Sequence, residues 1–185
     1  FKIMKNIFFL ILISFVLYSC KCEKTEVERY LLKNENKEYT NVNMRAIKYI
    51  DQDNNLIYSN FDGAKSILNE DRVGPEVCSY RTNEIVTENF VIGPYIGQAL
   101  FLNEILGVSL YNDTERYNLN IQSFQANQYD NALQDITLQG YTFNNVLVLE
   151  NSNEDDIYST IIYSKTNGIE FILFEDGSWY KRLDE

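Results

Sequence analysis

Short apolar runs near the C-terminus predict an antiparallel β-meander. The runs are rich in β-branched and aromatic residues, which fit a pleated, half-buried surface. They are Val146–Leu149, Ile157–Ser164, Ile169–Glu175 and Ser178–Leu183. Asn167-Gly168 and Asp176-Gly177 lie between the last three runs, and such pairs are strong hairpin signals. Apolar residues occupy both faces of the third run, so the sheet must be covered on both sides or curl into a sandwich or barrel.

Earlier segments extend the same pattern toward the N-terminus. In Glu84–Ile92, the residues Val86, Phe90 and Ile92 share one parity, as expected for a strand with one buried face. A polar turn over residues 51–55 separates two further strand-like runs. The additional predicted strands are Asn43–Ile50, Leu56–Asn60 and Tyr117–Gln122.

Helix signals are weaker and confined to two places. Asp62 is a candidate N-cap for a helix of about two turns over Gly63–Glu70. Ile96–Leu106 fits a short helix or a strand equally well. We therefore predict a mainly β fold over residues 42–185. It is a single antiparallel sheet domain, as a meander, sandwich or half-barrel, with one to three short helices.

A nearly continuous apolar run, Ile7–Tyr18, lies near the N-terminus behind Lys5 and the expected initiator Met4. At 1.5 Å per residue, a helix over this run spans about 18 Å, which is short of a hydrocarbon core of about 30 Å. A basic start followed by a short apolar run is typical of a secretory signal rather than a membrane-spanning helix.

The residues that follow resemble the lipobox of bacterial lipoproteins. Leu17-Tyr18-Ser19-Cys20 has an aliphatic residue at −3, a small residue at −1 and a cysteine that accepts the lipid. The resemblance implies a signal peptide over residues 1–19, diacylglyceryl transfer to Cys20 and acylation of the new amino terminus. Such an anchor holds a protein on a membrane. Lys21 stands where Asp favours inner-membrane retention, which implies the outer membrane. Residues 20–41 would then form a polar tether.

The closing hairpins carry a second resemblance. Their spacing is similar to that of many small Gram-negative outer-membrane lipoproteins. The residues concerned are Tyr163, Lys165, Gly168, Ile169, Asp176, Gly177 and Trp179. Those relatives have no agreed activity, so the resemblance implies an architecture and a location. A lipid-anchored sheet that holds something apolar is compatible with it.

Composition excludes several classes of function. Lys and Arg total 16 against 27 Asp and Glu, so the formal charge is −11, or −13 once Lys2 and Lys5 leave with the signal peptide. Nucleic-acid binding needs clustered positive charge, so no nucleic-acid partner is expected. The chain has no histidine, which excludes Ser-His-Asp and Cys-His catalysis and His-ligated zinc. No phosphate loop, Walker motif or nucleophile elbow occurs, and we predict no catalytic residue and no cofactor.

One acidic loop has the spacing of a weak calcium site. Asp51, Asp53 and Asn55 alternate, and Asp62 falls at the twelfth position of a loop that begins at Asp51. Alternate oxygen ligands suit a hard cation. Leu56, however, stands where an EF-hand needs glycine, and the alternative is an ordinary polar hairpin turn.

Lipidation of Cys20 would leave two other cysteines, Cys22 and Cys78. An oxidising envelope permits a disulfide between them. The alternative is one free thiol in the tether and one buried thiol that packs as a small apolar side chain.

These observations predict a lipid-anchored envelope protein whose acidic β domain binds an apolar ligand or a protein partner without catalysis. The alternative is a carboxylate-based glycan hydrolase, since paired Asp and Glu can supply acid–base chemistry. Two facing carboxylates in a cleft beside aromatic rings would favour the hydrolase. Aromatic side chains that line a groove would favour binding of a lipid, glycan or peptide.

Overall fold

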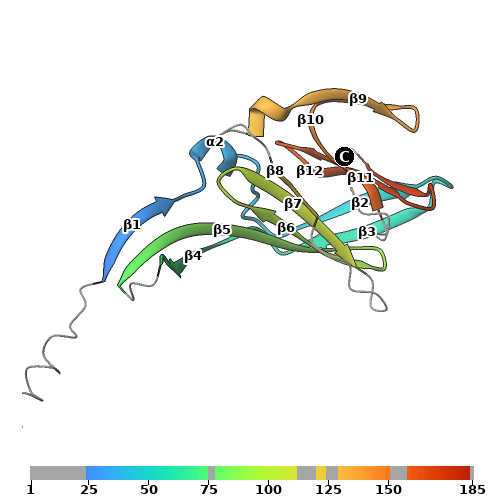
Figure 1. The fold of residues 1–185 in the computed structure, drawn as a ribbon. Helices are drawn as coiled ribbons and strands as arrows, with labels where there is room; N and C mark the ends of the chain where they lie inside the picture. The colour runs from blue at the N-terminus through green and yellow to red at the C-terminus, as the bar shows by residue number, and fades with distance from the viewer. Residues whose placement is uncertain (1–23, 75–77, 112–119, 124–128, 151–157, 184–185) are drawn as a thin grey trace, which may run out of the picture. The chain divides into compact units, whose positions relative to one another are not determined.

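The computed structural model describes residues 24–74, 78–111, 120–123, 129–150 and 158–183. The described chain falls into two units (Figure 1). The small unit contains residues 24–30 and 69–83, and the large unit contains residues 31–68 and 84–183. The predicted strand Tyr117–Gln122 lies mostly outside the described residues.

Nearly all described elements are β-strands. They are β1 (Thr25–Tyr30), β2 (Arg45–Asp51), β3 (Leu56–Phe61), β4 (Lys65–Arg72), β5 (Ser79–Ile92), β6 (Tyr95–Phe101), β7 (Ile105–Tyr111), β8 (Asn120–Ser123), β9 (Gln134–Leu138), β10 (Tyr141–Glu150), β11 (Tyr158–Ser164), β12 (Gly168–Phe174) and β13 (Trp179–Arg182). The described helical elements are α2 (Asn34–Lys37) and the 3-10 turn η1 (Tyr129–Ala132).

The strands of the large unit join in the order β8-β7-β6-β5-β3-β2-β13-β12-β11-β10-β9. Every neighbouring pair whose register is described along this path is antiparallel. In the small unit, β1 pairs in parallel with the first residues of β5, with Thr25 opposite Ser79. The predicted fold class, a mainly antiparallel β domain with few short helices, is confirmed.

The closing hairpins have the predicted form. β11, β12 and β13 are antiparallel neighbours, with Ser164 opposite Gly168 at the first turn and Leu173 opposite Trp179 at the second. Gly168 and Gly177 have φ of 76° and 84°, the left-handed conformation that these turns require and that glycine adopts without strain. The two Gly-containing pairs therefore set the register of the meander.

The sheet of the large unit curls so that its two wings share one core. Phe101 on β6 and Tyr163 on β11 are six strands apart along the sheet, which is about 29 Å in a flat sheet. Their ring centroids are nevertheless 6.1 Å apart. Tyr95 on β6 similarly stacks on Phe174 of β12 at 4.9 Å. The inner face is therefore filled with aromatic and aliphatic side chains from both wings.

Two short helical segments close one end of this core. Tyr129 of η1 is fully buried, and its hydroxyl donates to the carbonyl oxygens of Leu102 and Ile105. Asn36 of α2 accepts from the Tyr129 backbone N–H and donates to the carbonyl of Asn103. These bonds tie α2 and η1 to the turn between β6 and β7.

Two expectations for the first 70 residues differ from the structure. The described part of the expected tether includes β1 and α2, and its side chains Leu32, Asn36 and Tyr39 are buried. The folded region therefore starts before residue 42, because these side chains complete the core. The predicted helix over Gly63–Glu70 is wrong, since residues 65–70 belong to strand β4, which pairs with β5.

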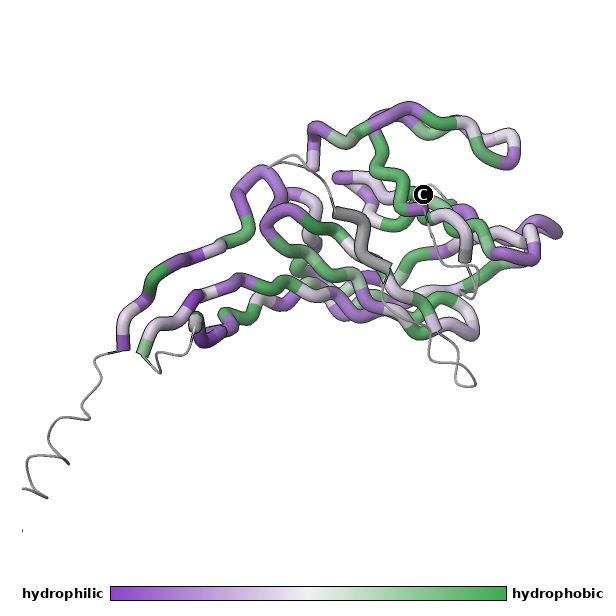
Figure 2. The backbone as a smooth tube through the Cα atoms, in the orientation of Figure 1, coloured by the Kyte–Doolittle hydropathy of each residue, from purple (hydrophilic) through white to green (hydrophobic). Residues whose placement is uncertain are grey.

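The outer face of β10–β12 is also covered, as the two-sided apolar pattern requires. Figure 2 shows hydrophobic residues along the second half of β10. That half, Val146–Glu150, pairs with β11, whereas Tyr141–Phe143 pairs only with β9. The strand bends between these halves, where Asn145 has a φ of 54° and its N–H donates to Asp135. The β9–β10 hairpin is thereby carried over the outer face (Figure 1).

Gly97→Ala is expected to destabilise the protein by roughly 1–3 kcal/mol. A methyl group at residue 97 would lie 2.4 Å from two carbons of the Phe90 ring and 2.6 Å from the carbonyl oxygen of Ser109. Phe90 is stacked on Phe61 in the core, and Ser109 belongs to the adjacent strand, so both resist displacement. Urea unfolding followed by circular dichroism measures the loss.

Gln98→Ala is the matched control for this substitution. It lies on the same strand, and its side chain donates to Asn89 at the surface, so a change within about 0.5 kcal/mol is expected. A Gly97→Ala protein as stable as this control would contradict the packing of β5 against β6 and β7.

Candidate functional site

A cleft of about 320 Å³ lies on the large unit beside the bent-over β9–β10 hairpin. We call it the hairpin cleft. Its volume is at the lower end of the range for small-molecule sites. Residues of β10, the β11–β12 turn, β12 and β13 line it: Tyr141, Thr142, Phe143, Asn144, Val146, Asn167, Glu170, Lys181 and Arg182.

Aromatic rings support one wall of the hairpin cleft. Tyr141 lies edge-on to Trp179 at 5.4 Å, although the two strands are three steps apart, about 14 Å, in a flat sheet. Phe143 contacts Phe171 at 5.5 Å, and Phe171 stacks on Trp179 at the same distance. Because each ring is held by its neighbours, Tyr141 and Phe143 present a fixed apolar surface to the cleft.

Charged side chains form the opposite part of the lining. Lys181 Nζ donates to the carbonyl of Arg182 and lies 5.0 Å from the centre of the Tyr141 ring. Arg182 Nη1 donates to the carbonyl of Asn167 at 2.5 Å. Glu170 Oε1 accepts from Ser164 and Asn167. The described lining thus combines two cations, one carboxylate, amide groups and aromatic rings.

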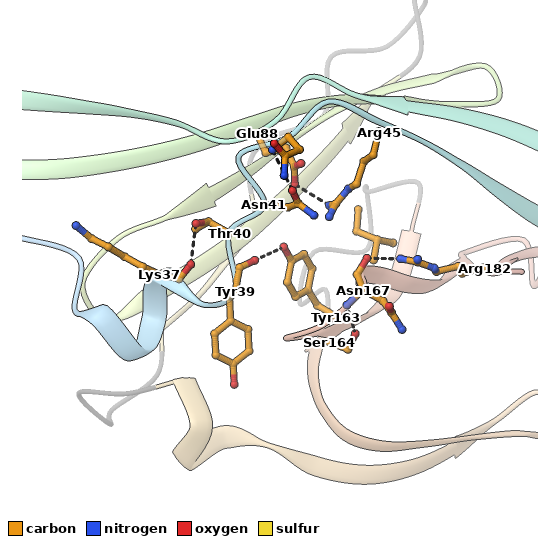
Figure 3. A network of polar contacts seen from close by, with 12 residues as sticks. Lys37, Tyr39, Thr40, Asn41, Arg45, Glu88, Tyr163, Ser164, Asn167 and Arg182 are labelled. Atoms are coloured by element: carbon orange, nitrogen blue, oxygen red, sulfur yellow. Dashed lines mark hydrogen bonds and ion pairs between the residues drawn. The ribbon is translucent and has the colours of Figure 1, made fainter. Parts of the chain in front are cut away.

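A buried ion pair lies inside the curled sheet (Figure 3). Glu88 Oε2 accepts from Arg45 Nη2 at 3.1 Å, and the two side chains are 1% and 16% exposed. The Arg45 guanidinium lies over the Phe61 ring at 4.8 Å. Glu88 Oε1 and Arg45 Nε are buried without a hydrogen-bond partner among the described residues. Burial raises the pKa of Glu88 to about 7, although Arg45 opposes this shift.

Glu84, four residues earlier on the same face of β5, has a different environment. Its carboxylate accepts from Ser66 Oγ at 2.8 Å and from the Leu32 N–H at 3.0 Å, and it pairs with Lys37 Nζ at 3.1 Å. Burial alone would raise the pKa of Glu84, but these bonds hold it below its usual value. Glu84 is therefore a satisfied structural carboxylate, whereas Glu88 is poised to titrate near neutrality.

The residues of the candidate calcium loop are only partly brought together. Asp51, Asp53 and Asn55 share the β2–β3 turn, but Asp62 lies beyond the other end of β3, about 20 Å along the strand. Asp51 accepts from the N–H groups of Asp53 and Asn55 and from the Asn55 side chain. These bonds, that of the Asn55 side chain first, lower the pKa of Asp51. Within the described ranges, no three metal-ligating side chains form a group that could hold a metal ion.

Cys78 is disulfide-bonded. Cys20 and Cys22, the other two cysteines of the chain, lie outside the described residues. The predicted pairing of Cys22 with Cys78 and the predicted lipidation of Cys20 therefore stay predictions. They fit together, because a sulfur that carries a lipid cannot also form a disulfide.

Sequence reasoning missed the polar groups of both sites. The signal for Glu84 and Glu88 was present, since both share the parity of Val86, Phe90 and Ile92 and so belong to the core face of β5. No comparable signal marks Lys181 and Arg182. They line a cleft only because β10 bends over this part of the sheet, and the bend occurs at the left-handed Asn145. Tyr141 and Phe143 do line a cleft, the arrangement that would favour ligand binding.

No protein-family model, curated protein or solved structure matches the chain. Among the described residues, no helix combines the length and the apolar character needed to cross a membrane.

Glu88 makes the stability of the protein depend on pH. Its folded-state pKa of about 7 exceeds the ordinary value of 4.5, so its protonated form stabilises the fold and this contribution is lost as the pH rises through 7. The free energy of unfolding is expected to fall by roughly 2–3 kcal/mol between pH 5 and pH 8. The chain has no histidine to obscure the change. Urea unfolding at several pH values measures it.

Glu88→Gln is expected to remove this fall, because the amide does not ionise. Glu84→Gln is the matched control on the same strand face. It should lower stability across the range and leave the fall between pH 5 and pH 8 in place, since the pKa of Glu84 is shifted the other way. An unchanged slope in Glu88→Gln would contradict the assignment.

Proposed function

We propose that this protein is a lipid-anchored envelope protein whose β domain binds a ligand in the hairpin cleft without transforming it. The observation that carries the proposal is the cleft itself. The β9–β10 hairpin covers the outer face of β11–β13 only in part. Between hairpin and sheet it leaves a lined space of about 320 Å³ with fixed aromatic rings and hydrogen-bonding groups.

The lining favours a polar ligand over a purely apolar one. Three charged side chains and three amide or hydroxyl side chains accompany the two aromatic rings and Val146. An apolar ligand would strip water from these groups without replacing its hydrogen bonds. A ligand with hydroxyl or carboxylate groups would replace them. The space inside the curled sheet, by contrast, is occupied by core side chains.

The carboxylates of the large unit favour binding over hydrolysis. Glycoside hydrolases place two carboxylates on either side of the scissile bond. Of the described residues that line the hairpin cleft, Glu170 is the one carboxylate, and its Oε1 accepts two hydrogen bonds within the protein. Glu84 and Glu88 lie on the inner face of β5 and do not line this cleft.

The anchor rests on the resemblance of Leu17-Tyr18-Ser19-Cys20 to a lipobox. Expressed in a Gram-negative host, the full chain is expected to carry acyl chains and to begin at Cys20 after processing. Cys20→Ala should lose the acyl mass and retain its leader, because the lipid acceptor is gone. Cys22→Ala, the neighbouring control, should be acylated normally. Intact-protein mass spectrometry measures both, and acylation of Cys20→Ala would contradict the anchor.

Trp179, the single tryptophan of the chain, reports on the cleft because it contacts Tyr141. We expect its fluorescence to change saturably with at least one member of a panel of neutral sugars, acidic sugars and short peptides. The change should persist in Tyr58→Ala, an exposed tyrosine outside the cleft, and disappear in Tyr141→Ala. Saturable binding that survives Tyr141→Ala, or no saturable response to any member, would contradict the proposal.

A further inference from the structure

The two cations of the hairpin cleft have no carboxylate partner among the described residues. Lys181 and Arg182 donate to backbone carbonyls, and no described carboxylate lies within salt-bridge distance of either side chain. Arg182 Nε is buried without a hydrogen-bond partner among the described residues. Among the described residues that line the hairpin cleft, Lys181 and Arg182 are the two cations, and neither forms an ion pair with Glu170.

The charge of the whole protein limits which anion can use them. The chain has a formal charge of −11, so it repels long polyanions. Screening confines this repulsion to about 8 Å at physiological salt, and a small ligand with one negative group is accepted where the local charge is positive. The three charged side chains of the described lining sum to one positive charge.

The other polar residues of the lining favour a ligand with uncharged hydrogen-bonding groups. Glu170 Oε1 accepts from the Ser164 hydroxyl at 2.6 Å and from the Asn167 amide at 2.8 Å, both uncharged. None of the described residues bonds Oε2, which leaves an acceptor for a ligand hydroxyl. Thr142 and Asn144 add a hydroxyl and an amide to the same lining. Amide and hydroxyl groups pair with vicinal hydroxyls as both donor and acceptor.

The aromatic rings of the cleft place a third requirement on the ligand. Tyr141 and Phe143 are fixed by Trp179 and Phe171, and they offer a flat surface to the apolar face of a ring. We infer that the hairpin cleft binds an acidic sugar, an inference that rests on the proposed binding function. Its carboxylate would pair with Arg182 and Lys181, its hydroxyls would bond Glu170 and the amides, and its ring would face Tyr141.

Fluorescence titration of the full chain with D-galacturonic acid and D-galactose tests the inference, because the two sugars differ only in the carboxylate. We expect galacturonic acid to bind at least about tenfold more tightly. Lys181→Gln should reduce this preference, and Arg182→Lys should reduce it further because the planar guanidinium is lost. Lys48→Gln, an exposed lysine of β2 outside the cleft, should retain it. Raising the salt from about 0.01 M to about 1 M should weaken only the acidic sugar.

Each outcome bears on one of the two claims. A preference for galacturonic acid that falls in Lys181→Gln but not in Lys48→Gln supports the inference. Equal binding of both sugars, lost in Tyr141→Ala, would overturn the acidic preference and leave the proposed binding function standing. Glycine is the zwitterionic probe, and tighter binding of glycine than of galacturonic acid would also overturn the inference. Failure of every probe of the wider panel would overturn the proposed function as well.

Discussion

The structure depends on one constraint: strands with apolar side chains on both faces must be covered on both sides. β12 places Ile169, Ile172 and Phe174 in the inner core and Phe171 in the outer cluster. The inner face is covered because the sheet curls and brings its two wings together. The outer face is covered because β10 bends at Asn145 and carries its first half, with β9, over β11–β13. The β9–β10 hairpin covers the outer face only in part, and the hairpin cleft is the space that stays open.

The curl also places charges inside the protein. Arg45 of β2 and Glu88 of β5 form a buried ion pair on the inner face, and Arg45 lies over the Phe61 ring. Where the hydrogen bonds of a buried carboxylate are complete, as around Glu84, the carboxylate stays ionised. Where they are incomplete, as around Glu88, burial dominates and the pKa rises to about 7. The state of the ion pair therefore reports how tightly the two wings of the sheet are packed.

Much of the fold was predictable because it is determined locally. Asn167-Gly168 and Asp176-Gly177 fix their turns through backbone conformation, and alternation fixes which face of β5 is buried. The helix predicted over Gly63–Glu70 failed because pairing with β5 outweighs a weak N-cap signal. The cleft was not predictable, since it depends on a bend that brings Tyr141 to Trp179 across three strands. A positive φ at an asparagine inside a strand leaves no clear trace in sequence.

The central claim is that the partial outer cover forms a binding site. Hydrogen–deuterium exchange of the protein, with and without saturating D-galacturonic acid, tests it most directly. We expect slower exchange in peptides from β9, β10, β12 and β13, and unchanged exchange in β2, β3 and β6. Slower exchange confined to β2, β3 and β6, or no difference in any of these peptides at saturation, would contradict the proposed binding site.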